Sequence, residues 1–218
     1  MQTEFWLERW QKNEIGFHQP DGNAYLHRYW RELALPTEAQ VFVPLCGKSR
    51  DLLWLRALGH PVLGSELAST AVRDFFAEAT LTPQVMPHAS GERWQADGIE
   101  IINGDFFALS HADLNDTPAV FDRAALIALP PPMRARYSAK MAELVNPNTQ
   151  MLLVTMEYAQ AQMAGPPFAV LEEEVRALYA PSFKIELLTR NNVLSENSRF
   201  RGRGITRLHE AVYRLRKQ

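Results

Sequence analysis

A glycine and a glutamate with the spacing of a cofactor site are the first residues of this sequence with recognisable chemistry. Gly47 follows the β-branched and aromatic run VFV, and Glu66 closes the run PVLGSE nineteen positions later. In a strand–helix–strand unit the first turn brings the backbone close to a ligand, and an acid about 20 residues further on accepts the ribose hydroxyls. The spacing predicts a site for an adenosine-containing cofactor. The competing interpretation is a simple turn glycine and a solvated carboxylate.

Two related phosphate-binding patterns do not fit this segment. The GxGxxG glycines that a dinucleotide pyrophosphate requires are absent. The letters GKS at positions 47 to 49 resemble a Walker A loop, but that pattern needs glycine where this chain has Phe42. Nicotinamide, flavin and nucleoside-triphosphate chemistry are therefore not expected.

Further candidate ligands follow later strands of the same expected sheet. Asp105 and Phe106 come after the β-rich run 99–103, and Arg123 stands at the end of the run 119–122. Ligands of such sheets sit beyond the carboxyl ends of the strands, so these residues are expected on the same rim as Glu66. Asp105 and Phe106 could hydrogen-bond and stack against adenine, with helix capping as the alternative for Asp105. Arg123 could pair with a cofactor carboxylate.

Two aromatic residues near the start of the chain are candidates for a lid. Trp10 belongs to an expected helix over 3–12, and Phe17 lies in the polar, turn-rich segment 13–21. Together they suggest that residues 1–22 close over a ligand. Ordinary core packing of the aromatic side chains is the alternative.

Cysteine and histidine chemistry is not indicated. Cys46 has no recognisable cysteine–histidine constellation around it and is predicted to be a small buried residue of the turn rather than a nucleophile. The six histidines show no ligand spacing such as HExxH. No metal site is therefore expected.

The elements that must position these residues alternate between strand and helix. Five strand–helix alternations up to residue 156 predict one α/β domain over 1–218, with a mostly parallel, Rossmann-like sheet and helices on both faces. The segment 81–97 is expected to be irregular, with a short edge strand around Val85. The runs 183–189 and 209–216 are predicted to form an antiparallel pair, joined by a polar connection without a helix.

Composition narrows the class of protein further. Apolar residues make up 46% and charged residues 22%, as in globular proteins, and the apolar runs are too short to cross a bilayer. The start of the chain lacks a secretory pattern, and a single cysteine excludes an internal disulfide, so a reducing, cytoplasmic setting is expected. A monomer is also expected. A net charge of −2 gives no general attraction to nucleic acid, despite the arginines at 199, 201, 203 and 207.

Six segments of the chain resemble the thiopurine S-methyltransferases, especially their bacterial branch. They span nearly the whole sequence, and PLCGKS and DRAAL are the most specific parts. The segments are WLERWQKNEIGFHQ at 6–19, VFVPLCGKSRDLLWL at 41–55, GHPVLGSEL at 59–67, GDFF at 104–107, DRAALIALPP at 122–131 and GPPF at 165–168. The resemblance implies a class I methyltransferase fold with a seven-stranded sheet containing one antiparallel strand.

The same resemblance implies a function and a set of contacts. The cofactor would be S-adenosylmethionine, converted to S-adenosylhomocysteine, and the reaction methyl transfer to the sulfur of an aromatic or heterocyclic thiol. Residues matching Trp10, Leu45, Glu66 and Arg123 would contact the cofactor, and Phe106 would lie against its adenine. No metal is implied.

The acceptor side is less specified by the resemblance. It implies an aromatic at Phe17 and an arginine in the late loop, which is Arg199 by alignment on Gly204 and Ile205, or Arg201 after a shift of two. The natural acceptor stays open. Selenium or tellurium species, small thiols or halides would use the same cofactor residues, and a non-catalytic protein that binds S-adenosylmethionine is a further alternative.

Overall fold

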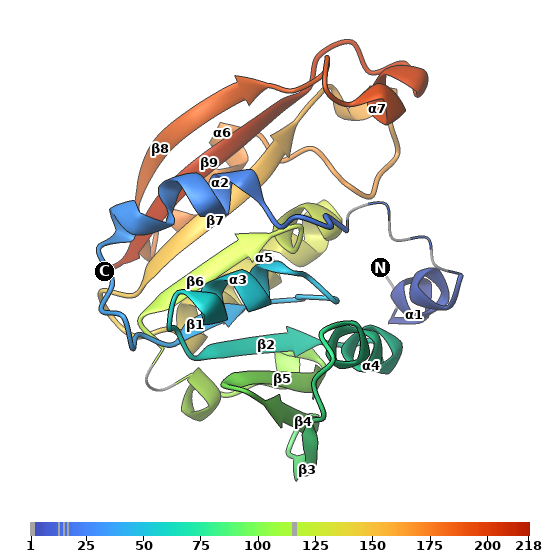
Figure 1. Cartoon of the computed structure of the whole chain (residues 1–218). Coiled ribbons are helices and arrows are strands. Elements are labelled where there is room, and N and C mark those ends of the chain that lie inside the picture. Colours follow the sequence, from blue (N-terminus) through green and yellow to red (C-terminus); the bar gives the residue numbers. More distant parts are fainter. Residues whose placement is uncertain (1–2, 13, 15, 17, 115–116) are drawn as a thin grey trace. The chain divides into compact units, whose positions relative to one another are not determined.

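A computed structural model describes residues 3–12, 14, 16, 18–114 and 117–218 of the chain (Figure 1). Its residues cluster into two compact units, Met1–Phe121 and Asp122–Gln218, called here the first and the second unit. No helix among the described residues is long and apolar enough to span a membrane.

The strands of the first unit carry the predicted cofactor residues at their ends. These strands lie in the sheet in the order β3-β4-β5-β2-β1-β6. Strands β5, β2, β1 and β6 are parallel to one another, whereas β3 and β4 form an antiparallel hairpin that pairs with β5 through β4. The strands are β1 (Val41–Val43), β2 (Val62–Glu66), β3 (Gln84–His88), β4 (Gly91–Ala96), β5 (Ile99–Gly104) and β6 (Ala119–Arg123), the last of which continues into the second unit. Both β1 and β2 are buried throughout, as their continuous apolar runs predict.

The helices of the first unit form where apolar residues recur at helical spacing, and α2 begins at a capping side chain. The side chain of Asn23 accepts hydrogen bonds from the N–H groups of Tyr25 and Leu26 and so begins α2. Leucines bury one face of α3, and Val72, Phe75 and Phe76 bury one face of α4. The helices are α1 (Thr3–Gln11), α2 (Ala24–Tyr29), α3 (Asp51–Ala57) and α4 (Ser69–Glu78), with 3₁₀ turns η1 (Trp30–Leu33), η2 (Phe106–Ala108) and η3 (His111–Leu114).

The second unit combines three long strands with short helices. Its strands β7 (Gln150–Glu157), β9 (His209–Lys217) and β8 (Phe183–Asn192) pair in that order, and both pairings are antiparallel. Helix α5 (Pro131–Leu144) begins with two prolines, which the unpaired N–H groups of a first helical turn tolerate. The other elements are α6 (Glu172–Tyr179), α7 (Ser198–Gly202), η4 (Leu126–Ala128) and η5 (Gln160–Gln162).

The predicted α/β class is confirmed, with differences in detail. The described residues form nine strands rather than seven, because the segment 81–97 folds into the β3–β4 hairpin; the edge strand expected around Val85 is confirmed as β3, whereas β4 was not expected. The antiparallel pair β8 and β9 is confirmed. The connection between them does contain a helix, α7, whose Phe200 packs against a buried cluster that includes Val193 and Ile205.

Candidate functional site

The turn after β1 has an unusual backbone that places it against the end of β2. Leu45 and Gly47 both have positive φ, 47° and 54°, and only the glycine adopts that conformation without steric cost. Leu45 donates its N–H to Ser65 Oγ at 3.3 Å, and Cys46 donates to the Ser65 carbonyl at 2.9 Å. The sequence analysis did not single out Ser65, although it lies directly before the predicted acid.

The carboxylate of Glu66 is held by backbone on both sides. Gly47 donates its N–H to Oε2 at 2.9 Å and Ala68 donates to Oε1 at 2.8 Å. Glu66 is only 6% exposed. Burial raises the pKa of Glu66 above its usual value, and the hydrogen bonds from the backbone of Ala68, Gly47 and Leu67 partly oppose that rise. The structure thus brings together the two residues on which the predicted site depends.

The geometry changes the interpretation of Gly47. Its N–H is used to fix Glu66, so the group that can address ribose hydroxyls is the carboxylate. Each carboxylate oxygen has two lone pairs, and one backbone donor on each leaves acceptor capacity for a pair of hydroxyls. The free acceptor capacity of Glu66 therefore fits the hydroxyl pair of an adenosine ribose.

Asn103, at the end of β5, supports the same strand end. Its Nδ2 donates to the carbonyls of Glu66 and Leu67, at 2.9 and 3.1 Å. Sequence reasoning missed this residue. A polar side chain at the end of the strand, directly after Ile101 and Ile102, was the available signal.

Asp105 and Phe106 follow on the next turn, in different environments. Asp105 is exposed, and its Oδ1 accepts the N–H of Phe107 at 2.9 Å, so the capping interpretation describes this side chain. The ring of Phe106 is 2% exposed and lies parallel to Phe42, with 6.4 Å between ring centroids. An adenine contact by either residue stays a prediction.

Trp10 of α1 packs beside the Glu66 turn. Its side chain, 8% exposed, belongs to a buried cluster with Ala68 and Ala71 at the start of α4. Ala68 is the residue whose N–H holds Glu66. Phe17 lies outside the described residues.

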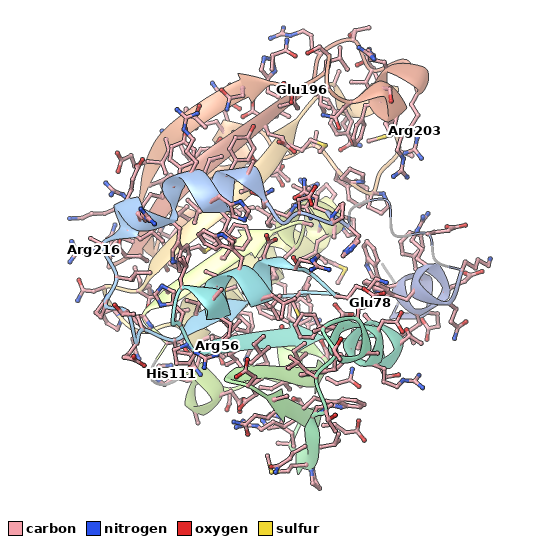
Figure 2. The ribbon with its side chains drawn as sticks, in the orientation of Figure 1. Arg56, Glu78, His111, Glu196, Arg203 and Arg216 are labelled. Carbon is pink, nitrogen blue, oxygen red and sulfur yellow. The ribbon has the colours of Figure 1, made fainter. Side chains whose placement is uncertain are left out.

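One ion pair and two hydrogen bonds fix the far side of the turn. Lys48 pairs with Glu78 of α4 at 2.6 Å, and Figure 2 labels Glu78 at that helix. The buried carboxylate of Asp51 accepts the N–H of Asn23 at 2.7 Å and the hydroxyl of Ser49 at 2.8 Å. Asp51 thereby ties the segment before α2 to the turn, a role that the sequence analysis did not identify.

Cys46 is buried at 7% exposure in this turn. Burial, and to a lesser degree the charge of Glu66, raises the pKa of the thiol well above its usual value. A neutral thiol is a poor nucleophile, which agrees with the packing role predicted for it. Among the described residues, no three side chains of histidine, cysteine, aspartate or glutamate form a group that could hold a metal ion.

The remaining predicted residues belong to the second unit. Arg123 is the half-buried last residue of β6 and precedes Ala124, whose φ is 64°. Arg199 is exposed on α7. Arg201 donates from Nη1 to the Ser195 carbonyl at 2.9 Å, within its own loop.

Arg203, labelled in Figure 2 beside α7, contacts a second loop of this unit. Its Nη1 lies 3.5 Å from Met163 Sδ, in the loop that precedes the GPPF segment. Gln162 and Thr206 connect the same two loops through their side chains, at 3.0 Å. The late loop and the GPPF loop are therefore neighbours within the second unit.

The family profile and the sequence relatives of this chain agree on one family. The profile of the thiopurine S-methyltransferase (TPMT) family matches residues 1–218. Thiopurine S-methyltransferases from Pseudomonas fluorescens strains Pf0-1 and SBW25 are each 50% identical to this chain, over 216 and 215 residues, with 99% of both chains covered in each case. The fold matches a solved SAM-dependent methyltransferase from Anabaena variabilis with a TM-score of 0.67 at 14% identity, covering 99% of this chain and 95% of that one. The architecture is thus that of the class I SAM-dependent methyltransferases.

Proposed function

We propose, from the premise that this chain belongs to the thiopurine S-methyltransferase family, that it methylates the sulfur of aromatic or heterocyclic thiols such as thiopurines. Family and fold make it an S-adenosylmethionine-dependent methyltransferase. The observation that carries the proposal is the buried Glu66 carboxylate, which two backbone N–H groups hold at the end of β2 with acceptor capacity to spare.

The cofactor side of the proposed site is assigned as follows. Glu66 binds the ribose hydroxyls, the turn of Leu45 and Gly47 borders the cofactor, and Trp10 covers it. Asp105 and Phe106 border the adenine, and Arg123 pairs with the carboxylate of the amino-acid part. The family resemblance supports these roles, together with the positions of the residues at strand ends.

The proposed reaction is an in-line displacement at a methyl carbon. S-adenosylmethionine supplies an electrophilic methyl group on a sulfonium. A bond forms between the acceptor sulfur and the methyl carbon while the sulfonium bond breaks, giving the methyl thioether and S-adenosylhomocysteine; a proton still on the acceptor goes to solvent. A thione or thiolate acceptor needs no general base, so the residues act by positioning, an effect worth roughly 7–11 kcal/mol in well-oriented systems.

The proposed acceptor residues are Phe17, Arg123 and Arg199. Between the two arginines considered for the late loop, we choose Arg199, because Arg201 is engaged by the Ser195 carbonyl. We further propose that residues 1–22 act as a lid, and packing of Trp10 on the start of α4 supports this.

The proposed enzyme acts on a small molecule, as a monomer, without a metal and in the cytoplasm. Its single cysteine supports a reducing compartment. Net charge, at −2, supports neither a nucleic acid nor an anionic membrane as partner.

A methyl-transfer assay tests the proposal. Purified protein is incubated with labelled S-adenosylmethionine and a panel of thiopurines, aromatic thiols, selenite, tellurite and halides, and S-adenosylhomocysteine binding is measured by calorimetry in parallel. We expect turnover on thiopurines and aromatic thiols. Preferred turnover on the metalloid species or halides would replace the proposed acceptor. Cofactor binding without turnover on any acceptor would identify a non-catalytic binding protein.

A further inference from the structure

The segment 104–113 of the first unit carries Asp105 and Phe106, and the β3–β4 hairpin contacts it at both ends. This segment leaves β5 at Gly104, passes through η2 and reaches η3. Sequence analysis predicted no hairpin here, and neither the family resemblance nor the proposed function gives the hairpin a role.

At the start of the segment the two backbones touch. Gly91, the first residue of β4, pairs with Gly104. A Cβ on Gly104 would lie 2.0 Å from the Ser90 carbonyl oxygen, and a Cβ on Gly91 would lie 2.1 Å from the Asn103 carbonyl oxygen. Such distances exclude any side chain at either position without a backbone shift, so the hairpin turn lies directly on the residue before Asp105.

At the end of the segment a histidine makes the connection. His88, the last residue of β3, lies with Nε2 2.8 Å from Asp113 Oδ1, and its Nδ1 is 2.8 Å from Ser90 Oγ. The other carboxylate oxygen of Asp113 accepts both the N–H and the hydroxyl of Ser110, at 2.7 and 2.9 Å. The side chains of His88 and Asp113 are only 10% and 13% exposed.

Charges around the pair favour an ionised Asp113. Arg93 of β4 lies 3.9 Å from Asp113 and 3.2 Å from Glu100. Burial raises the pKa of Asp113, but the hydrogen bonds from Ser110 and His88 outweigh burial and hold the pKa below its usual value. The bond from His88 is thus made to a charged acceptor, the kind that contributes most.

We propose that His88 is a positioning residue for the cofactor site: through Asp113 and the Ser90 turn, it holds the segment that carries Asp105 and Phe106. The inference rests on the proposed function for the identity of the cofactor. It predicts a role in cofactor affinity and none in acceptor binding, because the contacts of His88 and of the Ser90 turn are made to the segment on the adenine side.

Calorimetric binding of S-adenosylhomocysteine to the full-length protein tests this role. We expect His88→Ala to weaken binding about five- to tenfold, less than the loss of a hydrogen bond made directly to a charged group, because His88 acts on the cofactor site through Asp113. His88→Gln, whose amide can still donate to Asp113, should recover most of the affinity. Glu92→Ala is the matched control on the same hairpin, where the exposed carboxylate bonds only its neighbour Trp94 among the contacts described here, and it should bind like the wild type.

Three further measurements separate positioning from a loss of folding. In the protein without cofactor, hydrogen exchange should accelerate in His88→Ala at the amides of residues 107–110 and not in α3. In a double-mutant cycle, Asp113→Ala combined with His88→Ala should weaken binding no more than Asp113→Ala alone, because the bond from His88 is already lost in that single variant. In the transfer assay, the KM for S-adenosylmethionine should rise while the KM for the acceptor stays within about twofold.

The outcomes distinguish the inference from the proposed function. Unchanged S-adenosylhomocysteine affinity in a folded His88→Ala protein would overturn the inference, even if methyl transfer is observed. Equal losses in His88→Gln and His88→Ala with uniform acceleration of exchange would also overturn it, since they indicate general destabilisation. Weaker binding in His88→Ala without turnover on any acceptor would uphold the inference and reject the proposed reaction.

Discussion

Glu66 combines two properties that rarely occur together, a carboxylate and near-complete burial. Charged groups are buried when their partners replace water, and here the partners are the N–H groups of Gly47 and Ala68. These bonds hold both oxygens in one orientation before a ligand arrives. A preorganised acceptor pair loses little conformational freedom on binding, so the proposed hydrogen bonds to ribose would contribute nearly in full.

Replacing Glu66 tests this assignment at the scale of one residue. In Glu66→Gln one carboxylate oxygen becomes an NH₂ group that faces an N–H donor, and one ribose acceptor is lost. We expect S-adenosylhomocysteine affinity to fall by about 1.5–3 kcal/mol, the range for a hydrogen bond to a charged group. Isothermal calorimetry measures the effect.

A matched control for Glu66 lies in the second unit. Glu186→Gln removes an exposed carboxylate that pairs with Arg214, and it should leave cofactor affinity unchanged. If both variants bind equally well, Glu66 does not hold the cofactor, and its backbone bonds serve only the fold.

At the scale of elements, the contact between the β1 turn and β2 depends on a missing side chain. Gly64 lies in the middle of β2, and a Cβ there would be 2.8 Å from Cys46 Sγ and 3.3 Å from Ile101 Cγ1. Glycine normally weakens a strand, so its presence here marks a close approach of neighbouring atoms. The sulfur of Cys46 occupies the space that a larger residue would fill.

Gly64→Ala should therefore destabilise the protein by about 1–3 kcal/mol, the usual cost of overpacking a core. In the double variant Gly64→Ala/Cys46→Ala the sulfur is absent, so the combined loss should be smaller than the sum of the two single losses. Urea denaturation of the four proteins gives the coupling energy. Additive losses would show that Ile101, rather than Cys46, limits the space at this position.

Strand–helix alternation made the element order around the site predictable from the sequence. Apolar runs such as VFV predict buried strands, and parallel strands place their carboxyl ends together, so Glu66 and Asp105 were expected at the same edge. The β3–β4 hairpin gave a weaker signal because four of the five residues of β3 are exposed, which removes the alternation that marks a half-buried strand. Helix α7 is only five residues long, too short for a periodic pattern.

Contacts within the site were less predictable than the elements. The bond from Gly47 to Glu66 depends on two positive φ angles in one turn, and no residue spacing encodes the positive φ of Leu45. Asn103 and Asp51 act through side-chain bonds to residues more than 25 positions away in sequence. Partners so far apart in sequence can be identified only from the folded structure.

At the scale of the whole molecule, buried ionisable groups couple stability to pH. Asp122, in the DRAAL segment, is fully buried and accepts the hydroxyl of Tyr137 at 2.7 Å and the N–H of Leu126 at 3.4 Å. Burial raises the pKa of Asp122 from its usual 3.8 to about 6, with these hydrogen bonds in partial opposition. Tyr137 and Tyr179, also buried, have pKa values raised well above the usual value, so both stay neutral.

The raised pKa fixes the sign of the effect. Because the folded state binds this proton more tightly than the unfolded state, the contribution of Asp122 to stability is fully present below about pH 3.8 and is lost as the pH rises through about 6. By pH 7 the loss amounts to roughly 3 kcal/mol, at 1.36 kcal/mol per pKa unit. An uncharged side chain of the same shape would not show this loss of stability with rising pH.

Asp122→Asn is therefore expected to flatten the pH dependence of unfolding. Between about pH 4 and pH 7 the free energy of unfolding of the variant should rise relative to the wild type by up to roughly 3 kcal/mol. Urea denaturation of both proteins at the two pH values measures this difference, with Asp97→Asn, an exposed aspartate at 68% side-chain exposure, as control. Parallel pH profiles for wild type and Asp122→Asn would contradict this prediction. They would mean that the carboxyl group has the same pKa in the folded and unfolded states, so that the hydrogen bond from Tyr137 fully offsets the effect of burial.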